Sequence, residues 1–334
     1  MAERDLIRWI THRALLHPTT LVRGIGDDCA VIAGSNGQLL LVSTDTLTQG
    51  VHFFAEHHPP GLLGSKAAAV SISDVNAMGG RAEYAFLAVA IPPEKNSSWM
   101  KALLEGCVRK LDAAGCCLAG GDTVSSRSGL TVTMTVMGHV VGDRVVYRSG
   151  SRPGDLVWVS NTVGNAAAGL FLLAEGHAPY DPEKTPWRDL VVAHLAPEPP
   201  LTLGPCLAAT GEVHAMIDLS DGIATDLAHL ADAASVGAEV DAAALPLTDE
   251  LLRAAMQFNR DPVSWAVCGG EDFELLFTTP EMDPQSRNAF VSLVRAQTGC
   301  RITVIGRIRE ERGVILLRDG CRREISYQGY EHRL

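Results

Sequence analysis

The stretch GIGDDCAVI, residues 24–32, places two glycines immediately before two adjacent carboxylates, Asp27 and Asp28, and an apolar run. Glycine backbone leaves room for a phosphate group and offers it N–H donors, whereas a carboxylate repels phosphate. A divalent cation resolves this conflict, because the carboxylates hold the cation and the cation holds the phosphate oxygens. The stretch therefore predicts a loop that binds metal and phosphate together. It has neither the third glycine of a dinucleotide-binding fingerprint nor the Lys-Ser/Thr pair of a Walker A loop.

Further acidic residues stand where an apolar run meets a glycine turn or ends. With Asp27 and Asp28 they make nine carboxylates in six segments; the others are Asp45, Asp74, Asp122, Asp218, Asp221, Glu271 and Asp272. Any one of them is more simply explained as a turn residue or a helix cap, and Asp221 is placed to cap the helix that follows it. As a set they are better explained by a ligand site at the strand ends, where clustered carboxylates repel one another unless cations lie between them. The oxygen-rich set favours several Mg²⁺ ions.

The length of 334 residues exceeds one compact core and predicts two domains. The run RSGSRPGD combines glycine, proline and charge, so we place the boundary there, with domains 1–148 and 149–334. Apolar, β-rich runs alternate with segments of helical pattern, notably 62–78, 99–114 and 166–175. This alternation predicts an α/β or α+β protein.

Composition argues against several classes of protein. The formal net charge is −11 and no basic run occurs, so nucleic acid is not an expected partner. The start, MAERDLIRWITHRALLH, has the spacing of an amphipathic surface helix rather than a signal peptide. The longest uncharged stretch, 156–174, carries polar residues in its middle, so no membrane span is expected. The eight cysteines form no CxxC pair, which indicates reduced thiols in a cytoplasm.

Three other residues have both a functional and a plain interpretation. Arg148 is a candidate for a nucleotide phosphate, although an arginine at a domain boundary is more often solvated. Lys66 precedes Asp74 on a predicted helix, where it either neutralises phosphate or is an ordinary surface lysine. His52 follows the strand of Asp45 and is a candidate substrate contact. No Gly-x-Ser-x-Gly elbow or nucleophilic cysteine stands out.

The motifs taken together resemble the thiamine-monophosphate kinase family across residues 24–332. They appear in the order of that family: GIGDDCAVI, STDTLTQGVHF, SDVNAMGG, GGDT, RSGSRPGD, IDLSDG, GGEDFELLF and GYEH. Single motifs also occur in aminoimidazole ribonucleotide synthetase, selenophosphate synthetase and HypE. The complete ordered set is specific to the kinases.

This resemblance implies a two-domain fold of the aminoimidazole ribonucleotide synthetase type. The N-terminal domain would bind ATP and Mg²⁺ and pair with a second subunit around a β-barrel-like centre, and an α+β domain would follow it. The implied protein is a cytoplasmic homodimer. Its implied reaction is the Mg²⁺-dependent transfer of phosphate from ATP to thiamine monophosphate, giving thiamine diphosphate.

The resemblance also implies roles for individual residues. The implied metal ligands are Asp28, Ser43, Thr44, Asp45, Asp74, Asp122, Asp218 and Asp221, of which Asp45, Asp122 and Asp218 are the implied catalytic residues. The implied ATP contacts are Gly121, Asp122, Arg148 and Ser220. The implied thiamine phosphate contacts are His52, Glu271 and Tyr327. The chain departs from the usual family pattern at Gln49, Asn76, Asn165 and Tyr327, the last standing where tryptophan is common.

A phosphate acceptor is largely ionised at neutral pH, since its second pKa is about 6. Direct in-line transfer therefore needs no general base and no phosphoenzyme. The alternatives are another ATP-dependent synthetase of the superfamily, a non-catalytic nucleotide-binding or metal-binding relative, and a metal-dependent phosphohydrolase. Selenophosphate synthetases carry a reactive Cys or Sec ahead of the glycine loop, and HypE proteins end in cysteine, whereas this sequence has no such residue before GIGDD and ends EHRL.

Overall fold

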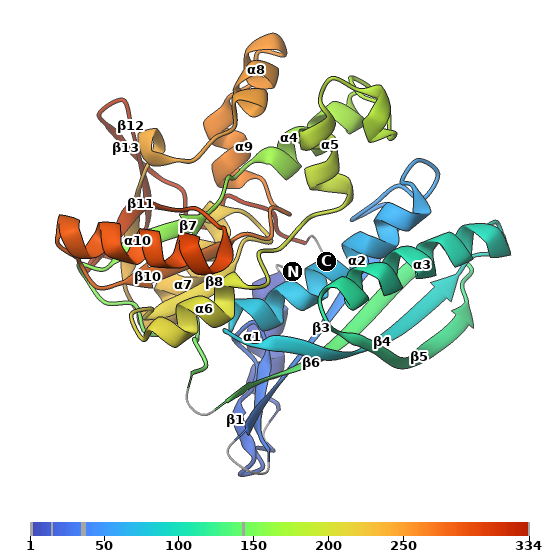
Figure 1. Ribbon diagram of the computed structural model, residues 1–334, viewed down its shortest axis with the longest axis horizontal. Helices are drawn as coiled ribbons and strands as arrows, with labels where there is room; N and C mark the ends of the chain where they lie inside the picture. The colour runs from blue at the N-terminus through green and yellow to red at the C-terminus, as the bar shows by residue number, and fades with distance from the viewer. Residues whose placement is uncertain (1–2, 15, 35–37, 142–143, 333–334) are drawn as a thin grey trace.

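The structure is a computed structural model and describes residues 3–14, 16–34, 38–141 and 144–332. These residues form two halves, each built around its own mixed sheet, with helices α2 and α3 on one and most other helices on the other (Figure 1). The two ends of the chain lie side by side between the halves, because Arg4 Nε contacts Glu331 Oε1 at 3.0 Å.

The first sheet has six strands in the order β1-β2-β3-β6-β4-β5, all antiparallel neighbours except the parallel pair β4 and β5. Most residues of β6 are β-branched, and β3 and β6 pair over eleven residues in continuous register. The bounds are β1 (Leu21–Arg23), β2 (Ala30–Ala33), β3 (Gln38–Thr48), β4 (Arg81–Ile91), β5 (Cys117–Ser125) and β6 (Thr131–Val141).

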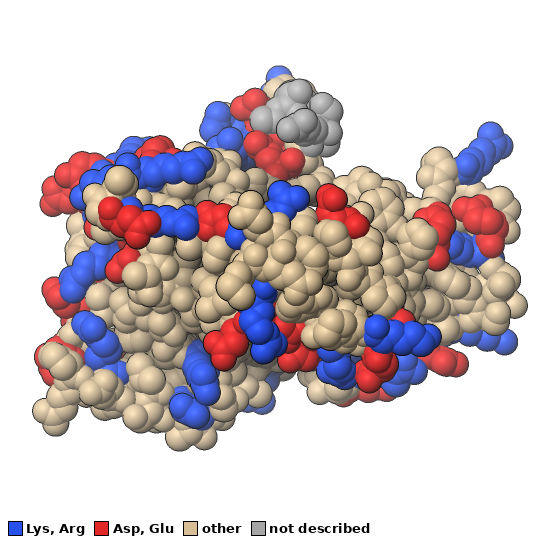
Figure 2. Space-filling view, turned by 90° about the horizontal axis from the view of Figure 1, so that it is seen from above, with Lys and Arg blue, Asp and Glu red and all other residues tan. Residues whose placement is uncertain are grey.

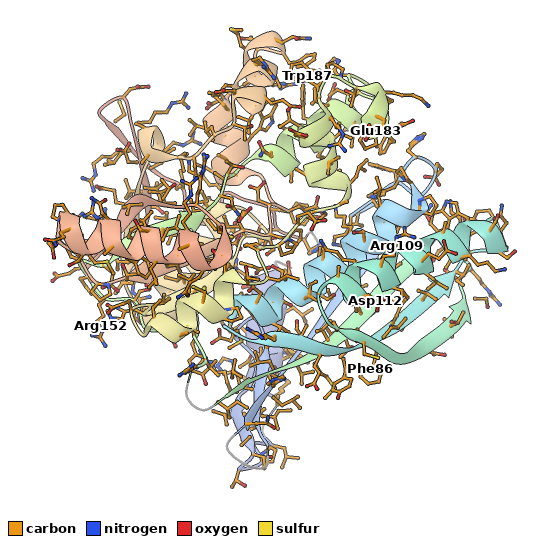
Figure 3. The ribbon with its side chains drawn as sticks, in the orientation of Figure 1. Phe86, Arg109, Asp112, Arg152, Glu183 and Trp187 are labelled. Atoms are coloured by element: carbon orange, nitrogen blue, oxygen red, sulfur yellow. The ribbon has the colours of Figure 1, made fainter. Side chains whose placement is uncertain are left out.

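Helices α2 (Pro60–Ala77) and α3 (Ser97–Ala113) cover one face of this sheet and bury its core. The alanine-rich sequence of α2 lets the helix pack closely against the strands, and Asn96 caps α3 by accepting from the Trp99 N–H. The opposite face is bare: Tyr84 and Phe86 of β4 are 43% and 39% exposed. Figure 3 shows Phe86 on the side of the sheet away from α3.

The second sheet has seven strands in the order β13-β12-β9-β11-β7-β10-β8, antiparallel except for β12 and β9. Every residue of β7 and β10 is buried, because alternate side chains enter different cores on the two faces of the sheet. The bounds are β7 (Leu156–Ser160), β8 (Ala215–Asp218), β9 (Gly237–Asp241), β10 (Leu275–Thr279), β11 (Ile302–Arg309), β12 (Gly313–Arg318) and β13 (Cys321–Glu324).

The helices of the second half form three groups. Helix α7 (Ile223–Ala234) packs on one face of the sheet, and α6 (Leu203–Thr210) with α10 (Pro284–Thr298) packs on the other. A third group forms its own core around Leu172 and Leu190 at the top of Figure 1. It consists of α4 (Asn165–Ala174), η2 (Pro182–Lys184), α5 (Arg188–Leu195), α8 (Asp249–Gln257) and α9 (Pro262–Cys268), while the short η3 (Ala242–Ala244) follows β9.

Most sequence expectations about the fold are confirmed. The three predicted helices are α2, α3 and α4, and the N-terminal amphipathic helix is α1 (Glu3–Thr11), which has no buried residue. All eight cysteines lie in the described part and are free. The expected barrel-like centre is not seen in the single chain: among the described residues the first sheet is open, with β1 and β5 at its edges.

The surface carries charges of both signs. On the face drawn in Figure 2, lysines and arginines are interspersed with acidic side chains around an uncharged central area. Within the described ranges, each helix is too short or too polar to cross a bilayer.

Candidate active site

Three carboxylates from three distant segments meet where the two halves touch. Asp28 precedes β2, Asp74 lies on α2, and Asp218 is the last residue of β8. Each offers an oxygen, and these oxygens all lie within 4.8 Å of one another. The sequence predicted that these residues share a site, and the packing of α2 against β8 brings them together.

Asp45 lies at the edge of this carboxylate cluster, beside Asp74. Alternation along β3 turns Ser43 and Asp45 toward α2, where the Ser43 hydroxyl donates a hydrogen bond to Asp74. Oδ2 of Asp28 and Oδ2 of Asp45 are buried and find no hydrogen-bond partner among the described residues. Buried carboxylate oxygens without partners are costly unless a cation satisfies them, and these hard oxygens fit Mg²⁺.

Burial raises the pKa of each carboxyl group in the cluster. For Asp74 the charges of Asp45 and Asp218 raise the pKa further, well above its usual value. For Asp218 burial and the charge of Asp28 raise the pKa to about 7. A bound cation would relieve this repulsion and keep the carboxylates ionised.

Arg148 and Asp27 fix the loop that carries Asp28. Nε of Arg148 lies 3.1 Å from Oδ1 of Asp28, and the backbone N–H of Arg148 donates to Oδ1 of Asp27 at 2.9 Å. The other oxygen of Asp27 accepts from Nε of Arg23 at 3.0 Å. Asp27 therefore shapes the loop. Gly26 has φ +116, and a Cβ there would point into open space, which leaves this side of the loop free for a ligand.

The IDLSDG segment leads from β8 to α7. Asp221 does not cap α7, because Oδ2 of Asp226 accepts from the backbone N–H groups of Asp221 and Gly222. Asp221 instead lines a cavity of about 50 Å³ beneath α1, together with Glu3 and Tyr327. Burial and the charge of Glu3 raise the pKa of Asp221 to about 6.

Aromatic and histidine side chains lie around this cavity. The guanidinium of Arg4 sits 3.7 Å from the centre of the Tyr327 ring, and the Tyr327 hydroxyl donates to Asp232 at 2.6 Å. His52 packs against His332 with ring centres 5.1 Å apart. The Thr48 N–H donates to Nδ1 of His52, which leaves Nε2 as the protonated nitrogen.

Glu271 and its neighbour Asp272 have different surroundings. Glu271 pairs with Lys66 of α2 at 2.7 Å, so the interpretation of Lys66 as a surface lysine is wrong. Asp272 caps α4: its two oxygens accept from the N–H groups of Gly164 and Ala166. Asp272 therefore acts as a helix cap, but for a helix more than 100 residues earlier in the chain rather than for a local one.

Three implied site residues, Thr44, Gly121 and Asp122, lie on the first sheet away from the carboxylate cluster in this single chain. Asp122 of β5 lies opposite Ala88 of β4, and Ala88 lies opposite Thr133 of β6. Thr133 in turn lies opposite Thr46 of β3, so Asp122 and Thr46 are on the same, bare face of the first sheet. Thr44 faces the same side, where its hydroxyl bonds that of Thr135. Gly121 precedes Asp122 on the edge strand β5, while Ser220 remains beside Asp221 in the loop after β8.

Sequence reasoning missed several groups that hold the site. Ser73 donates to Asp218 at 2.6 Å, and His194 approaches Glu271 at 2.9 Å. Ser73 is adjacent to Asp74, but no local pattern links it to a strand 145 residues later. Asn76, one of the departures from the family pattern, bridges the halves by accepting from the Gly204 N–H.

Comparison with known proteins identifies both halves of the chain. Residues 26–140 match the family model of the AIR synthase related protein, N-terminal domain, and residues 152–318 match that of the C-terminal domain. The chain is 36% identical over 310 residues to the thiamine-monophosphate kinase of Salmonella typhimurium, covering 92% of this chain and 91% of that one. It is 34% identical to the Bacillus subtilis thiamine-monophosphate kinase, covering 99% of both.

Solved structures agree with the sequence relatives. The complex of AaThiL with AMPPCP and TMP has a TM-score of 0.84 and 30% identity, covering 99% of this chain and 97% of that one. Thiamine-monophosphate kinase from Stenotrophomonas maltophilia has a TM-score of 0.77 and 33% identity, covering 96% of each. Escherichia coli HypE, at 18% identity and a TM-score of 0.70 with 97% of each chain covered, shares the fold alone.

Proposed function

The chain belongs to the thiamine-monophosphate kinase family, and from this premise we propose that it transfers a phosphoryl group from ATP to thiamine monophosphate. The products are thiamine diphosphate and ADP. We further propose that residues 1–148 form the ATP-binding, Mg²⁺-binding and dimerisation domain and that residues 149–334 form the α+β domain. The enzyme would act in the cytoplasm.

The observation that carries this proposal is the carboxylate cluster with unsatisfied oxygens on Asp28 and Asp45. Asp28, Asp45, Asp74 and Asp218 would hold Mg²⁺, with Asp221 as a further ligand on the cavity side. Bound Mg²⁺ supplies positive charge that neutralises phosphate oxygens and keeps two anionic substrates together. Four clustered carboxylates without a cation have no comparable structural use, since burial raises the pKa of each and the charges of the other three raise that of Asp74 further.

The chain's own groups orient the reactants rather than move protons. The attacking oxygen of a phosphate acceptor is already ionised near pH 7, so no side chain is needed as a general base. Arg148 fixes the loop of Asp28, and the open backbone at Gly26 leaves space for phosphate oxygens. We propose direct in-line transfer, in which these groups align donor and acceptor and no aspartate is phosphorylated.

We propose a homodimer built on the first sheet. Strand β5 is an unpaired edge in the single chain, and Tyr84, Phe86 and Val124 form an exposed apolar group on or beside it. Pairing with a second copy would bury this apolar group and give hydrogen-bond partners to the backbone groups at the edge of β5. Gly121, Asp122 and Thr44 lie on the same surface, so their proposed ATP and metal roles belong to the dimer.

A product assay tests the proposal. The purified protein is incubated with ATP and MgCl₂ and with thiamine monophosphate, thiamine or no acceptor, and products are separated by chromatography. We expect thiamine diphosphate only with the monophosphate and only with Mg²⁺. Phosphate release without an acceptor would indicate a phosphohydrolase, and ATP binding without turnover would indicate a non-catalytic relative.

A further inference from the structure

Lys66 is the feature on which this inference rests. It lies on α2 of the first half, and its side chain is 0% exposed. Its ammonium contacts Oε1 of Glu271 at 2.7 Å and donates to the backbone oxygen of His194 at 3.2 Å. A buried ammonium keeps its charge only beside an opposite charge, so this lysine depends on Glu271.

Both carboxylate oxygens and the backbone N–H of Glu271 have partners in the protein. Oε1 contacts Lys66, and Oε2 lies 2.9 Å from Nδ1 of His194. Its backbone has φ +69, a left-handed conformation rare for a non-glycine residue, and its N–H donates to the Ser220 oxygen at 2.8 Å. Strained backbone of this kind persists where the surrounding contacts over-determine a functional geometry.

Lys66 and His194 change how the Glu271 carboxylate can interact with a ligand. The charge of Lys66 and the contact with His194 hold the pKa of Glu271 well below its usual value, although burial alone would raise it. The carboxylate is thus ionised while Lys66 cancels its charge. What remains is a fixed hydrogen-bond acceptor that does not repel a phosphate-bearing substrate.

Part of this carboxylate remains exposed, unlike the two groups that hold it. The Glu271 side chain is 23% exposed, whereas Lys66 and His194 are buried behind it. The charge of Glu271 acts on Tyr330, which lines the cavity beneath α1. It also acts on His52, which packs against His332 beside Tyr330. Lys66 therefore does not reach a ligand directly and acts through Glu271.

We propose that Lys66, supported by His194, is a positioning residue that fixes Glu271 as a charge-neutralised acceptor for an amino group on the heterocycle of the acceptor substrate. This inference rests on the proposed function. It assigns the recognition of the substrate ring to an ion pair that spans the two halves of the molecule, separate from the phosphate-binding carboxylates.

A purely structural role is the competing explanation, because the same pair ties α2 to the second half. Lys110 provides a matched control. It is also a buried lysine of the first half, and it also contacts the second half, through Glu198 and the Pro197 oxygen. Lys110→Met should therefore reproduce a loss of inter-half contact without touching Glu271.

The test measures KM for thiamine monophosphate and for ATP, kcat and thermal unfolding in Lys66→Met, Lys66→Arg, Glu271→Gln and the double variant Lys66→Met/Glu271→Gln. We expect Lys66→Met to raise KM for thiamine monophosphate at least about tenfold and to leave KM for ATP within about twofold. Lys66→Arg should recover part of the loss. In the Glu271→Gln background, Lys66→Met should raise KM for thiamine monophosphate little further, since both changes disrupt the same ion pair.

The contrary results are equally clear. The inference falls if folded Lys66→Met keeps the wild-type KM for thiamine monophosphate, or if Lys110→Met changes that KM as much. Should Lys66→Met not fold, His194→Leu removes the contact to Oε2 while Lys66 stays paired, and an unchanged KM there overturns the inference. A wild-type enzyme without thiamine monophosphate turnover overturns the proposed function, and the inference falls with it.

Discussion

The hydroxyl of Ser73 donates a 2.6 Å hydrogen bond to Oδ2 of Asp218, joining helix α2 of the first half to the end of strand β8 in the second. Both groups are buried, and Ser73 is followed in the chain by Asp74 of the carboxylate cluster. This bond lowers the pKa of Asp218 against the effect of burial. The two halves are therefore tied at the point where the metal ligands converge.

Ser73→Ala should weaken Mg²⁺ binding by roughly tenfold. Removal of a hydrogen bond that orients a ligand typically costs that much in metal affinity. Titration of turnover with MgCl₂ measures the change. Ser151→Ala is the control, because Ser151 is also buried but bonds Thr278 away from the cluster. An unchanged Mg²⁺ requirement in Ser73→Ala would show that Asp218 needs no such support.

Asp45→Asn should have opposite effects on stability and on activity. Without metal the variant should melt about 2 °C higher than the wild type, because a buried negative charge next to Asp74 has been removed. It should gain little from added MgCl₂ and lose turnover by roughly a hundredfold or more. Calorimetry with EDTA and with MgCl₂ checks the first part. Near wild-type turnover would remove Asp45 from the metal site.

Glu274 should make stability depend on pH. Burial raises the pKa of Glu274 to about 8 from its ordinary value near 4.5, although Ser160 and Asn161 hydrogen-bond it. Because the folded-state pKa is raised, its contribution is present below about pH 4.5 and is lost as the pH rises toward 8. While it titrates, the free energy of unfolding falls by up to about 1.4 kcal/mol per pH unit.

Glu274→Gln mimics the protonated group and should flatten this dependence. Urea unfolding of both proteins at intervals between pH 5 and 8.5 provides the comparison, and the difference between the two curves isolates Glu274 from the aspartates of the cluster. Parallel curves would mean that Glu274 has the same protonation in the folded and unfolded states.

Phe86→Asp should prevent association of the first sheet with a second copy. Phe86 is 39% exposed on the bare face, and a charge there would be desolvated in any interface that covers it. Sedimentation velocity should then show a monomer, and the product assay should show little activity. Asp112→Lys, on the exposed side of α3 across the sheet (Figure 3), should leave the sedimentation coefficient unchanged. A Phe86→Asp protein that still sediments as a dimer would place the interface elsewhere.

Several elements could be predicted from sequence because their cause is local. The helical spacing of α2, α3 and α4 and the apolar runs of β3, β7 and β10 depend on neighbouring residues, so their positions agree with the pattern. The exposure of one face of the first sheet could not be predicted from local sequence in this way. Tyr84 and Phe86 stand in an apolar run typical of a buried strand. Only the placement of α2 and α3 decides which face of the sheet remains exposed.

The sequence alone determined the set of carboxylates, their position at the ends of apolar runs, and the ordered motifs that identify the family. The tertiary structure decided which of them meet: Asp28, Asp45, Asp74 and Asp218 converge, Asp272 caps a helix, and Asp122 lies on the other face of the sheet. It also decided that Lys66 is buried against Glu271. The reason is physical. Local patterns fix the direction of a side chain on its own helix or strand, whereas contacts between segments more than a hundred residues apart depend on how the two sheets and their helices pack.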